Sequence, residues 1–254
     1  MSGTQGPKAL VAGISGCSSS GKTTLARLLR DIFPSTFILH QDDFYKPEAE
    51  LPSRDGLIDW DCSQALDIAA LSDALSHIRQ HAVFPPTLES KEDDNSVGQC
   101  PVAESTVASL KARVDDALPA SHPLRSGKLR LCFLDGFLLY SPSMAALQAH
   151  FDMKLFVRTS YASAKARREA RDGYVTLEGF WKDPPGYVDK IVWPNYVREH
   201  AWMFERGDVE GAYDEAAVEK EGIRVLGEAA VDSSLEQTLV WMVESVLDEL
   251  KKHQ

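Results

Sequence analysis

Short apolar runs alternate with longer stretches of helical periodicity along this chain. The runs that indicate strands are residues 10–14, 36–40, 129–134, 154–158 and 223–227. Between them, apolar residues recur at spacings of three and four, as in LARLLRDIF at residues 25–33, a spacing typical of helices that bury one face. Strands that alternate with helices predict an α/β fold with a mostly parallel, five-stranded sheet and helices on both of its faces.

A helix is also predicted near the end of the sequence. Its apolar face consists of Leu235, Leu239, Met242, Val243, Val246 and Leu250. Ser233 and Glu236 have the spacing of a capping box, so we expect them at the start of this helix. We expect the helix to close the core, and a partner-binding helix is the alternative.

The composition changes between residues 85 and 128. The segment PPTLESKEDDNSVGQCP is polar, charged and rich in helix breakers, and a helix is predicted after it, with Val107, Leu110, Val114 and Leu118 on one side. We expect a surface insertion here, within a single domain that spans residues 1–254. A chain of 254 residues is long enough to bury one sizeable core.

Charge and hydropathy limit the expected partners. The formal net charge is −11, whereas proteins that bind nucleic acid usually carry a basic face. No apolar run approaches the length that crosses a membrane, and the opening residues MSGTQGPK lack the layout of a signal peptide. We therefore expect a cytoplasmic protein, with the nucleus as an alternative, that is a monomer or a weak homodimer. The four scattered cysteines are expected to be free thiols.

Residues 16–23, GCSSSGKT, fit the phosphate-loop pattern GxxxxGK[ST] between a predicted strand and a predicted helix. Backbone N–H groups and the helix start would surround a phosphate, while Lys22 would reach the β and γ phosphates and Thr23 would bind Mg²⁺. The Cys17 thiol is expected to have no role. The expected nucleotide contacts are Gly16, Cys17, Ser18, Ser19, Ser20, Gly21, Lys22, Thr23 and Thr24. A chance turn is the alternative. The chain has no NKxD-like guanine motif, which favours ATP.

A kinase needs a carboxylate that deprotonates the attacking hydroxyl and an acid that helps to hold Mg²⁺. Candidates lie where predicted strands end, because ligands of parallel sheets bind at that edge: Asp42, Asp43, Asp61 and Asp135. On an extended segment, adjacent side chains point to opposite sides. We therefore expect Asp42 to face the phosphate loop and Asp43 to brace its own loop. The alternatives are that the pair caps a turn and that Asp61 lies near a helix N-cap.

Several segments together resemble the nicotinamide riboside kinases, which belong to the uridine kinase and pantothenate kinase branch of the P-loop kinases. These segments are GISGCSSSGKTTLA, QDDFYKP, DWD, LDGFLLY, ARREAR and DPPGYVDKIVWPNYV. The resemblance covers most of the chain outside residues 85–128 and the extreme ends. It implies a P-loop NTPase fold with a lid region near 161–190. It also implies phosphorylation of the 5′-hydroxyl of nicotinamide riboside by ATP with Mg²⁺, a reaction of NAD biosynthesis.

The resemblance also implies residue roles. Asp42 would be the general base and lie near Mg²⁺, together with Lys22 as the second catalytic residue. Trp60, where the family usually has tyrosine, and Asp61 would hold the nucleoside. Asp135, where the family commonly has glutamate, would bind Mg²⁺, and a shorter side chain can do so through water.

The resemblance implies three further roles, for the arginine run and for Tyr174 after it. Arg167 and Arg171 would contact the nucleotide phosphates, Arg168 the ribose and Tyr174 the nicotinamide. The spacing before Tyr174 is one residue longer than in the animal proteins. Without the resemblance, three arginines at helical spacing more often form a solvated face.

Two further expectations concern aromatic residues. Phe44 and Tyr45 are expected to be walls of the nucleoside pocket. The VWPNYV segment is expected to be structural, with Pro194 in the first turn of a helix, and a direct role in substrate binding is the alternative. A uridine or cytidine kinase is the alternative function, and a P-loop regulatory protein that hydrolyses ATP without transfer to a small molecule is the second.

Overall fold

A computed structural model of the chain describes residues 7–90, 100–171, 173–176, 179–227 and 231–253. Its central sheet has five parallel strands in the order β2-β5-β1-β6-β9. The strands are β1 (Lys8–Gly16), β2 (Thr36–His40), β5 (Leu129–Gly136), β6 (Met153–Val157) and β9 (Ile223–Val225). Each predicted strand is confirmed, and so is the parallel arrangement.

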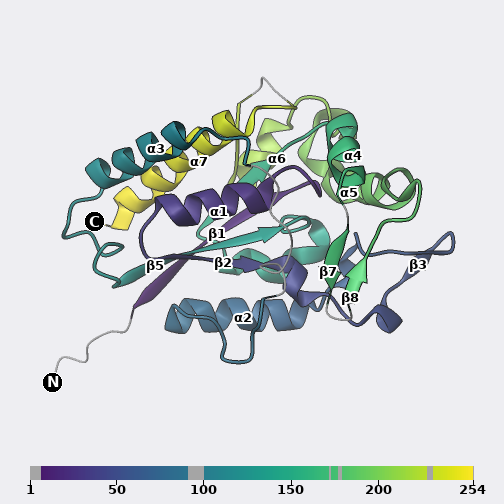
Figure 1. The fold of residues 1–254 in the computed structure, drawn as a ribbon, viewed down its shortest axis with the longest axis horizontal. Coiled ribbons are helices and arrows are strands. Elements are labelled where there is room, and N and C mark those ends of the chain that lie inside the picture. Colours follow the sequence, from purple (N-terminus) through teal and green to yellow (C-terminus); the bar gives the residue numbers. More distant parts are fainter. Residues whose placement is uncertain (1–6, 91–99, 172, 177–178, 228–230, 254) are drawn as a thin grey trace.

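Helices cover both faces of this sheet, as predicted (Figure 1). On one face lie α1 (Lys22–Ile32), α3 (Glu104–Ala117) and α7 (Leu235–Leu250), and on the other lies α2 (Ile68–His81). The remaining helices are α4 (Tyr161–Glu169), α5 (Trp193–His200) and α6 (Glu215–Lys220). Two small antiparallel hairpins consist of β3 (Ser53–Arg54) with β4 (Leu57–Ile58) and of β7 (Tyr174–Thr176) with β8 (Gly179–Trp181). Within the described ranges, no helix is long and apolar enough to span a membrane.

The core forms because β1 is apolar on both sides. Val11 packs into the cluster that includes Leu75 of α2, whereas Ile14 packs into the cluster that includes Leu25 of α1 and Leu239 of α7. All five side chains are fully buried, and each such burial stabilises the fold by about 1.5–3 kcal/mol. The two-sided burial holds β1, and the loop that follows it, rigidly at the centre of the sheet.

The helix predicted after the segment PPTLESKEDDNSVGQCP is present as α3, and it lies beside α7 (Figure 1). Leu110, Val114 and Leu118 are buried in the same cluster as the α7 side chains, with Val107 packed against them. This part of the expected insertion therefore contributes to the core. Residues 91–99 of the same segment lie outside the described residues.

The start of α7 differs from the prediction by one residue. The capping box consists of Ser234 and Gln237, not Ser233 and Glu236. The Ser234 hydroxyl accepts a hydrogen bond from the Gln237 N–H at 3.1 Å, and the Ser234 N–H donates to Oε1 of Gln237 at 3.2 Å. The pattern was ambiguous because Gln at the third helical position forms the box as well as Glu does. The rest of the prediction holds, since α7 buries its apolar face in the core.

Candidate active site

The phosphate loop connects β1 to α1, as predicted, and both of its glycines are required by the backbone. Gly16 has φ 149°, and a Cβ there would lie 2.0 Å from the Val157 carbonyl oxygen of β6. Gly21 has φ 95°, and a Cβ there would lie 2.5 Å from Cδ2 of Leu235. Neither position accommodates a side chain, so the loop depends on glycine for its curvature.

The Lys22 side chain is hydrogen-bonded within the phosphate loop. Its Nζ donates a hydrogen bond of 2.8 Å to the Cys17 carbonyl, and the side chain is buried.

The Cys17 thiol is also buried, and burial raises its pKa to about 12. This thiol is therefore protonated at neutral pH. Cys17, Cys62, Cys100 and Cys132 are all free.

A polar cavity of about 60 Å³ lies against the loop, at the edge where the parallel strands end. The loop and the start of α1 contribute Ser18, Ser19, Gly21, Lys22, Thr23 and Thr24 to its lining. Four further predicted site residues also line it, namely Asp42, Asp135, Arg171 and Tyr174. The fold thus brings together residues that are far apart in the sequence. Gly16, Cys17 and Ser20 are buried and do not belong to the lining of this cavity.

Asp135 reaches the cavity from the end of β5. The parallel register pairs it with Ile14 of β1 and with His40 of β2. The Thr23 hydroxyl donates a hydrogen bond of 2.5 Å to Oδ2 of Asp135, and Nδ1 of His40 lies 3.4 Å from the same oxygen. Burial would raise the pKa of Asp135, but the hydrogen bond from His40 and the charge of Lys22 outweigh it and lower the pKa. The carboxylate is therefore ionised at neutral pH.

The Thr23 hydroxyl and the Asp135 carboxylate fit Mg²⁺, which prefers hard oxygen ligands and is commonly held by one or two carboxylates plus phosphates. Asp42 supplies a second carboxylate on the same cavity. Thr23, Asp135 and Asp42 are thus the residues that would hold the ion.

The QDDF segment is a 3₁₀-helix, Gln41–Phe44, rather than the extended segment that was expected. Asp42 nevertheless lines the cavity while Asp43 does not, because successive side chains of a 3₁₀-helix are about 120° apart. Phe44 is buried in the core, whereas Tyr45 is half-buried and meets Trp60 edge-on at 5.2 Å. Of the two expected pocket walls, Tyr45 is therefore the one that lies beside a predicted substrate residue.

Gln41 has a structural role that was not predicted. Its Oε1 accepts hydrogen bonds from the N–H groups of Phe137 at 2.9 Å and Leu138 at 3.3 Å. These bonds fix the turn that follows Asp135. A glutamine directly after a strand carries no sequence signal that would have indicated this long-range contact.

Arg168 of α4 is the centre of a buried ion cluster. Its Nη1 and Nη2 donate to the two oxygens of Asp61 at 2.9 and 3.0 Å, and its Nε donates to Asp183 at 2.6 Å. Nη1 also donates to the Ser18 hydroxyl of the phosphate loop at 2.8 Å. Burial raises the pKa of Asp61, which the charge of Arg168 only partly offsets. Asp61 and Arg168, both predicted, are thus adjacent, and Asp183 is a third member of the cluster that no motif in the sequence indicated.

The alternative interpretation of Asp61 as a helix-cap residue is wrong. The N-cap of α2 is Asp67, which accepts a hydrogen bond from the Ala70 N–H at 2.9 Å. Asp61 lies six positions earlier and faces Arg168 instead.

Asp59 and Asn195 hold the DWD segment in place. Nδ2 of Asn195 donates to both oxygens of Asp59, at 2.8 and 3.0 Å, and the Asp61 N–H donates to Oδ1 of Asp59 at 3.1 Å. Asn195 belongs to the VWPNYV segment, whose Pro194 lies in the first turn of α5. Through Asn195 and Asp59, that segment positions Asp61.

Aromatic side chains surround Trp60. The Tyr187 hydroxyl accepts a hydrogen bond from the Trp60 N–H at 3.0 Å and donates to the Ile58 carbonyl at 2.9 Å. The Trp60 ring lies 5.6 Å from that of Trp181 on β8. Trp60 is 6% exposed, and its indole N–H has no acceptor among the described residues.

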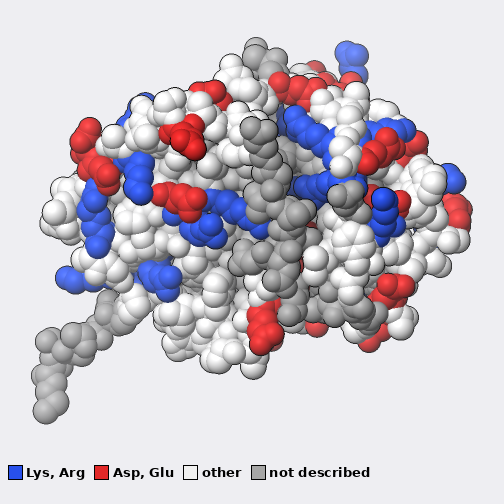
Figure 2. Space-filling model, viewed as in Figure 1, with Lys and Arg blue, Asp and Glu red and all other residues white. Residues whose placement is uncertain are grey.

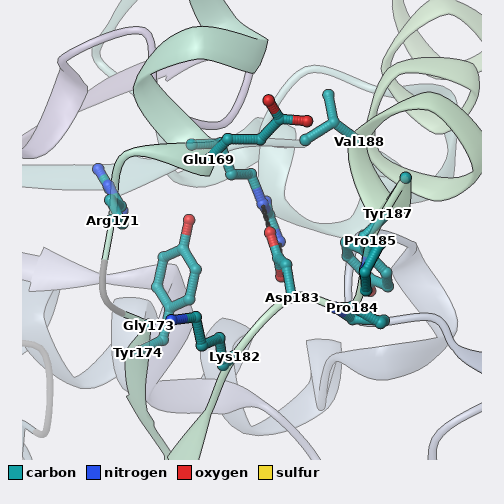
Figure 3. Close-up of a pocket in the computed structure, with 12 residues that line it drawn as sticks. Glu169, Arg171, Gly173, Tyr174, Lys182, Asp183, Pro184, Pro185, Tyr187 and Val188 are labelled. Atoms are coloured by element: carbon teal, nitrogen blue, oxygen red, sulfur yellow. Dashed lines mark hydrogen bonds and ion pairs between the residues drawn. The ribbon is translucent and has the colours of Figure 1, made fainter.

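Tyr174 lies beside arginines. The guanidinium carbons of Arg168 and Arg171 are each 5.1 Å from the Tyr174 ring centroid. A second cavity, of about 180 Å³, lies next to it, with Arg171 and Tyr174 on one side and Pro184, Pro185 and Tyr187 on the other (Figure 3).

The arginine run faces the site. Arg167 and Arg171 are exposed, and Nη1 of Arg167 lies 3.5 Å from the Ser19 carbonyl of the phosphate loop. Figure 2 shows basic side chains gathered on this face beside α4. In an acidic protein, this local positive charge suits the phosphates of a nucleotide.

Comparison with known proteins gives two fungal relatives of nearly equal similarity. The chain is 36% identical over 244 residues to the nicotinamide riboside kinase of Schizosaccharomyces pombe, which covers 96% of this chain and 99% of the relative. It is 37% identical over 239 residues to the nicotinamide riboside kinase of Eremothecium gossypii, with 93% of each chain covered. No family model matches.

A solved structure described as a "Possible Uridine Kinase from Bacillus stearothermophilus" is also similar, with a TM-score of 0.42 and 16% identity. The match covers 78% of this chain and 83% of the other.

Proposed function

This chain belongs to the nicotinamide riboside kinase family, and we propose that it transfers the γ-phosphoryl group of ATP to the 5′-hydroxyl of nicotinamide riboside. The product would be nicotinamide mononucleotide, an intermediate of NAD biosynthesis. One observation carries the proposal: Lys22, Asp42 and Asp135 line a single cavity against the phosphate loop. This is the minimum set for phosphoryl transfer, namely a cation for the phosphates, a base for the acceptor and a ligand for the metal.

Asp42 is the general base in this proposal. It accepts the proton of the 5′-hydroxyl as the oxygen bonds to the γ-phosphorus, and the bond from that phosphorus to the leaving oxygen breaks to release ADP. The exposure of Asp42 toward the cavity supports the role, because a base must be within hydrogen-bond reach of the proton that it removes.

Positive groups stabilise the charge that develops on the transferred phosphoryl group. Lys22 is already inside the loop, and Arg167 and Arg171 approach it from the lid region. When bound, Mg²⁺ would neutralise phosphate charge and help to align the phosphates. Thr23, Asp135 and Asp42 are the residues that would hold it.

The nucleoside lies, in this proposal, near Trp60, Asp61 and Arg168. An aromatic surface suits the cationic pyridinium ring, and a carboxylate suits the ribose hydroxyls as an acceptor. Asp61 directly follows Trp60 in the chain, and its partner Arg168 donates a hydrogen bond to Ser18 of the phosphate loop. The ribose would thus be held between the binding place of the nicotinamide ring and that of the ATP phosphates.

Mass analysis of the products tests the proposed transfer. The purified protein is incubated with ATP, Mg²⁺ and nicotinamide riboside. We expect nicotinamide mononucleotide and ADP in equal amounts. Release of ADP and inorganic phosphate without a phosphorylated nucleoside would support the regulatory ATP-hydrolysing alternative and overturn the proposal.

A further inference from the structure

Trp181 occupies a place in the nucleoside site that no sequence motif indicates. It ends β8, and its ring lies 5.6 Å from that of Trp60 and 6.0 Å from that of Tyr187. Its indole N–H donates a hydrogen bond of 2.9 Å to Asp183, which in turn accepts from Arg168. Trp181 thus contacts Trp60, which is proposed to stack on the nicotinamide ring, and it is hydrogen-bonded to the ion cluster that is proposed to hold the ribose.

The register of the β7–β8 hairpin explains how Trp181 comes to lie there. Tyr174 is directly opposite Trp181, and Val175 is directly opposite Phe180. Residues directly opposite each other in an antiparallel pair share one face, so Tyr174 and Trp181 point to the same side. Phe180 points to the other side and is 64% exposed. The hairpin therefore presents two aromatic rings to the site, of which the family resemblance named only Tyr174.

The surroundings of the two rings differ in charge. Tyr174 has the guanidinium groups of Arg168 and Arg171 against its ring, and a pyridinium cation would meet repulsion there. Trp181 is hydrogen-bonded to a carboxylate. Tryptophan is also the aromatic residue that attracts cations most strongly. A cationic base is therefore better placed against Trp181 than against Tyr174.

From these contacts, and resting on the proposed function, we propose that Trp181 is the second aromatic wall of the nucleoside site, opposite Trp60. Tyr174 then belongs to the arginine and phosphate side of the site, in keeping with its place in the lining of the phosphate-loop cavity. The centroids of the two indoles are 5.6 Å apart and their planes are tilted by 51°, whereas a flat ring stacked between them needs parallel walls about 7 Å apart, or two contacts of about 3.5 Å. Binding of the nicotinamide ring thus requires the Trp181 side chain to move outward and to turn toward the plane of Trp60.

The test compares variants of the hairpin by steady-state kinetics. We expect Trp181→Leu to raise the KM for nicotinamide riboside about 10-fold, the scale of a lost cation–π contact, with the KM for ATP within about 2-fold. Trp181→Phe keeps a flat ring and should recover most of the loss. Phe180→Ala is the matched control on the opposite face of the hairpin and should behave as the wild type.

Tyr174→Leu is the decisive comparison. We expect this variant to change the KM for ATP or kcat more than the KM for nicotinamide riboside. The reverse pattern, with Tyr174→Leu raising the nucleoside KM and Trp181→Leu leaving it within about 2-fold, would overturn the inference. If Trp181→Leu and Trp181→Phe raised the KM for nicotinamide riboside and the KM for ATP to the same extent, the inference would also be overturned, since that pattern indicates a structural role. Wild-type protein that does not phosphorylate nicotinamide riboside would instead contradict the proposed function itself.

Discussion

The Thr23 hydroxyl donates a hydrogen bond of 2.5 Å to the carboxylate of Asp135, joining the first turn of α1 to the end of β5. Both oxygens suit Mg²⁺. We expect Asp135→Asn to raise the Mg²⁺ concentration for half-maximal activity about 10-fold, because one anionic ligand is lost. Titration of activity with Mg²⁺ measures this. Asp31→Asn on the exposed side of α1 is the control, and an unchanged Mg²⁺ requirement in Asp135→Asn would remove Asp135 from the metal site.

The lowered pKa of Asp135 sets the direction of its pH dependence. Because the folded-state pKa lies below the ordinary value of 3.8, this carboxylate contributes stability above pH 3.8 that is lost as the pH falls through the folded-state pKa. Asp135 should therefore stay ionised between pH 8 and pH 5.

Asp42 and Asp43 are adjacent but should respond differently to the same substitution. We expect Asp42→Asn to lower kcat by about 100-fold or more, the scale of a lost general base, and to leave ATP binding nearly intact. Asp43→Asn should keep most of the activity, since Asp43 does not line the cavity. Near-normal turnover in Asp42→Asn would contradict the role assigned to this residue.

The buried His200 should make stability depend on pH. Burial lowers its pKa to about 4 from the ordinary 6.5, while its Nδ1 is hydrogen-bonded to the Tyr196 carbonyl at 2.9 Å. The unfolded chain takes up a proton below pH 6.5 and the folded chain does not, so stability falls as the pH falls from 6.5 to 4. Between pH 7 and pH 5 this amounts to about 2 kcal/mol.

Urea unfolding at several pH values tests the His200 prediction. The wild type should lose about 2 kcal/mol more of its free energy of unfolding between pH 7 and pH 5 than His200→Gln does. The comparison of slopes removes the contribution of the carboxylates, which both proteins share. Equal slopes would show that His200 does not remain neutral in the fold.

The thiols should react unequally with an alkylating reagent. Cys17, Cys62 and Cys132 are buried, and burial raises their pKa values to about 12, 11 and 12, whereas Cys100 is exposed. Since the thiolate is the reactive form, iodoacetamide at pH 8 should add one group per folded chain, at Cys100, and leave activity unchanged. Peptide mass analysis locates the group, and modification of Cys17 with loss of activity would count against an inert phosphate-loop thiol.

Local sequence patterns predicted the framework of the site, but they did not predict the long-range contacts within it. The phosphate loop, the five strands and the positions of Asp42 and Asp135 at the strand ends follow from apolar periodicity and one motif. The bond between Asn195 and Asp59 joins residues 136 positions apart, and the pair of Arg168 with Asp183 depends on how the lid region folds back. No spacing rule encodes such contacts.

The hairpin illustrates the limit of residue-by-residue transfer from a family. The resemblance implied Tyr174 by its place after the arginine run, whereas the strand pairing sets Trp181 opposite Tyr174 and in contact with Trp60. A residue role can be transferred by position in the chain only where the backbone between the motifs has the same length in both proteins. Here that backbone is one residue longer.

A competition assay tests the proposed substrate most directly. Nicotinamide riboside, uridine and cytidine are supplied together with ATP and Mg²⁺, and the rates at which their monophosphates form give the ratio of kcat/KM values. We predict a ratio that favours nicotinamide riboside by about 10-fold or more, since it alone of the three carries a cationic base, which an aromatic surface attracts. Preferential phosphorylation of uridine or cytidine would contradict the proposed function and identify the protein as a pyrimidine nucleoside kinase.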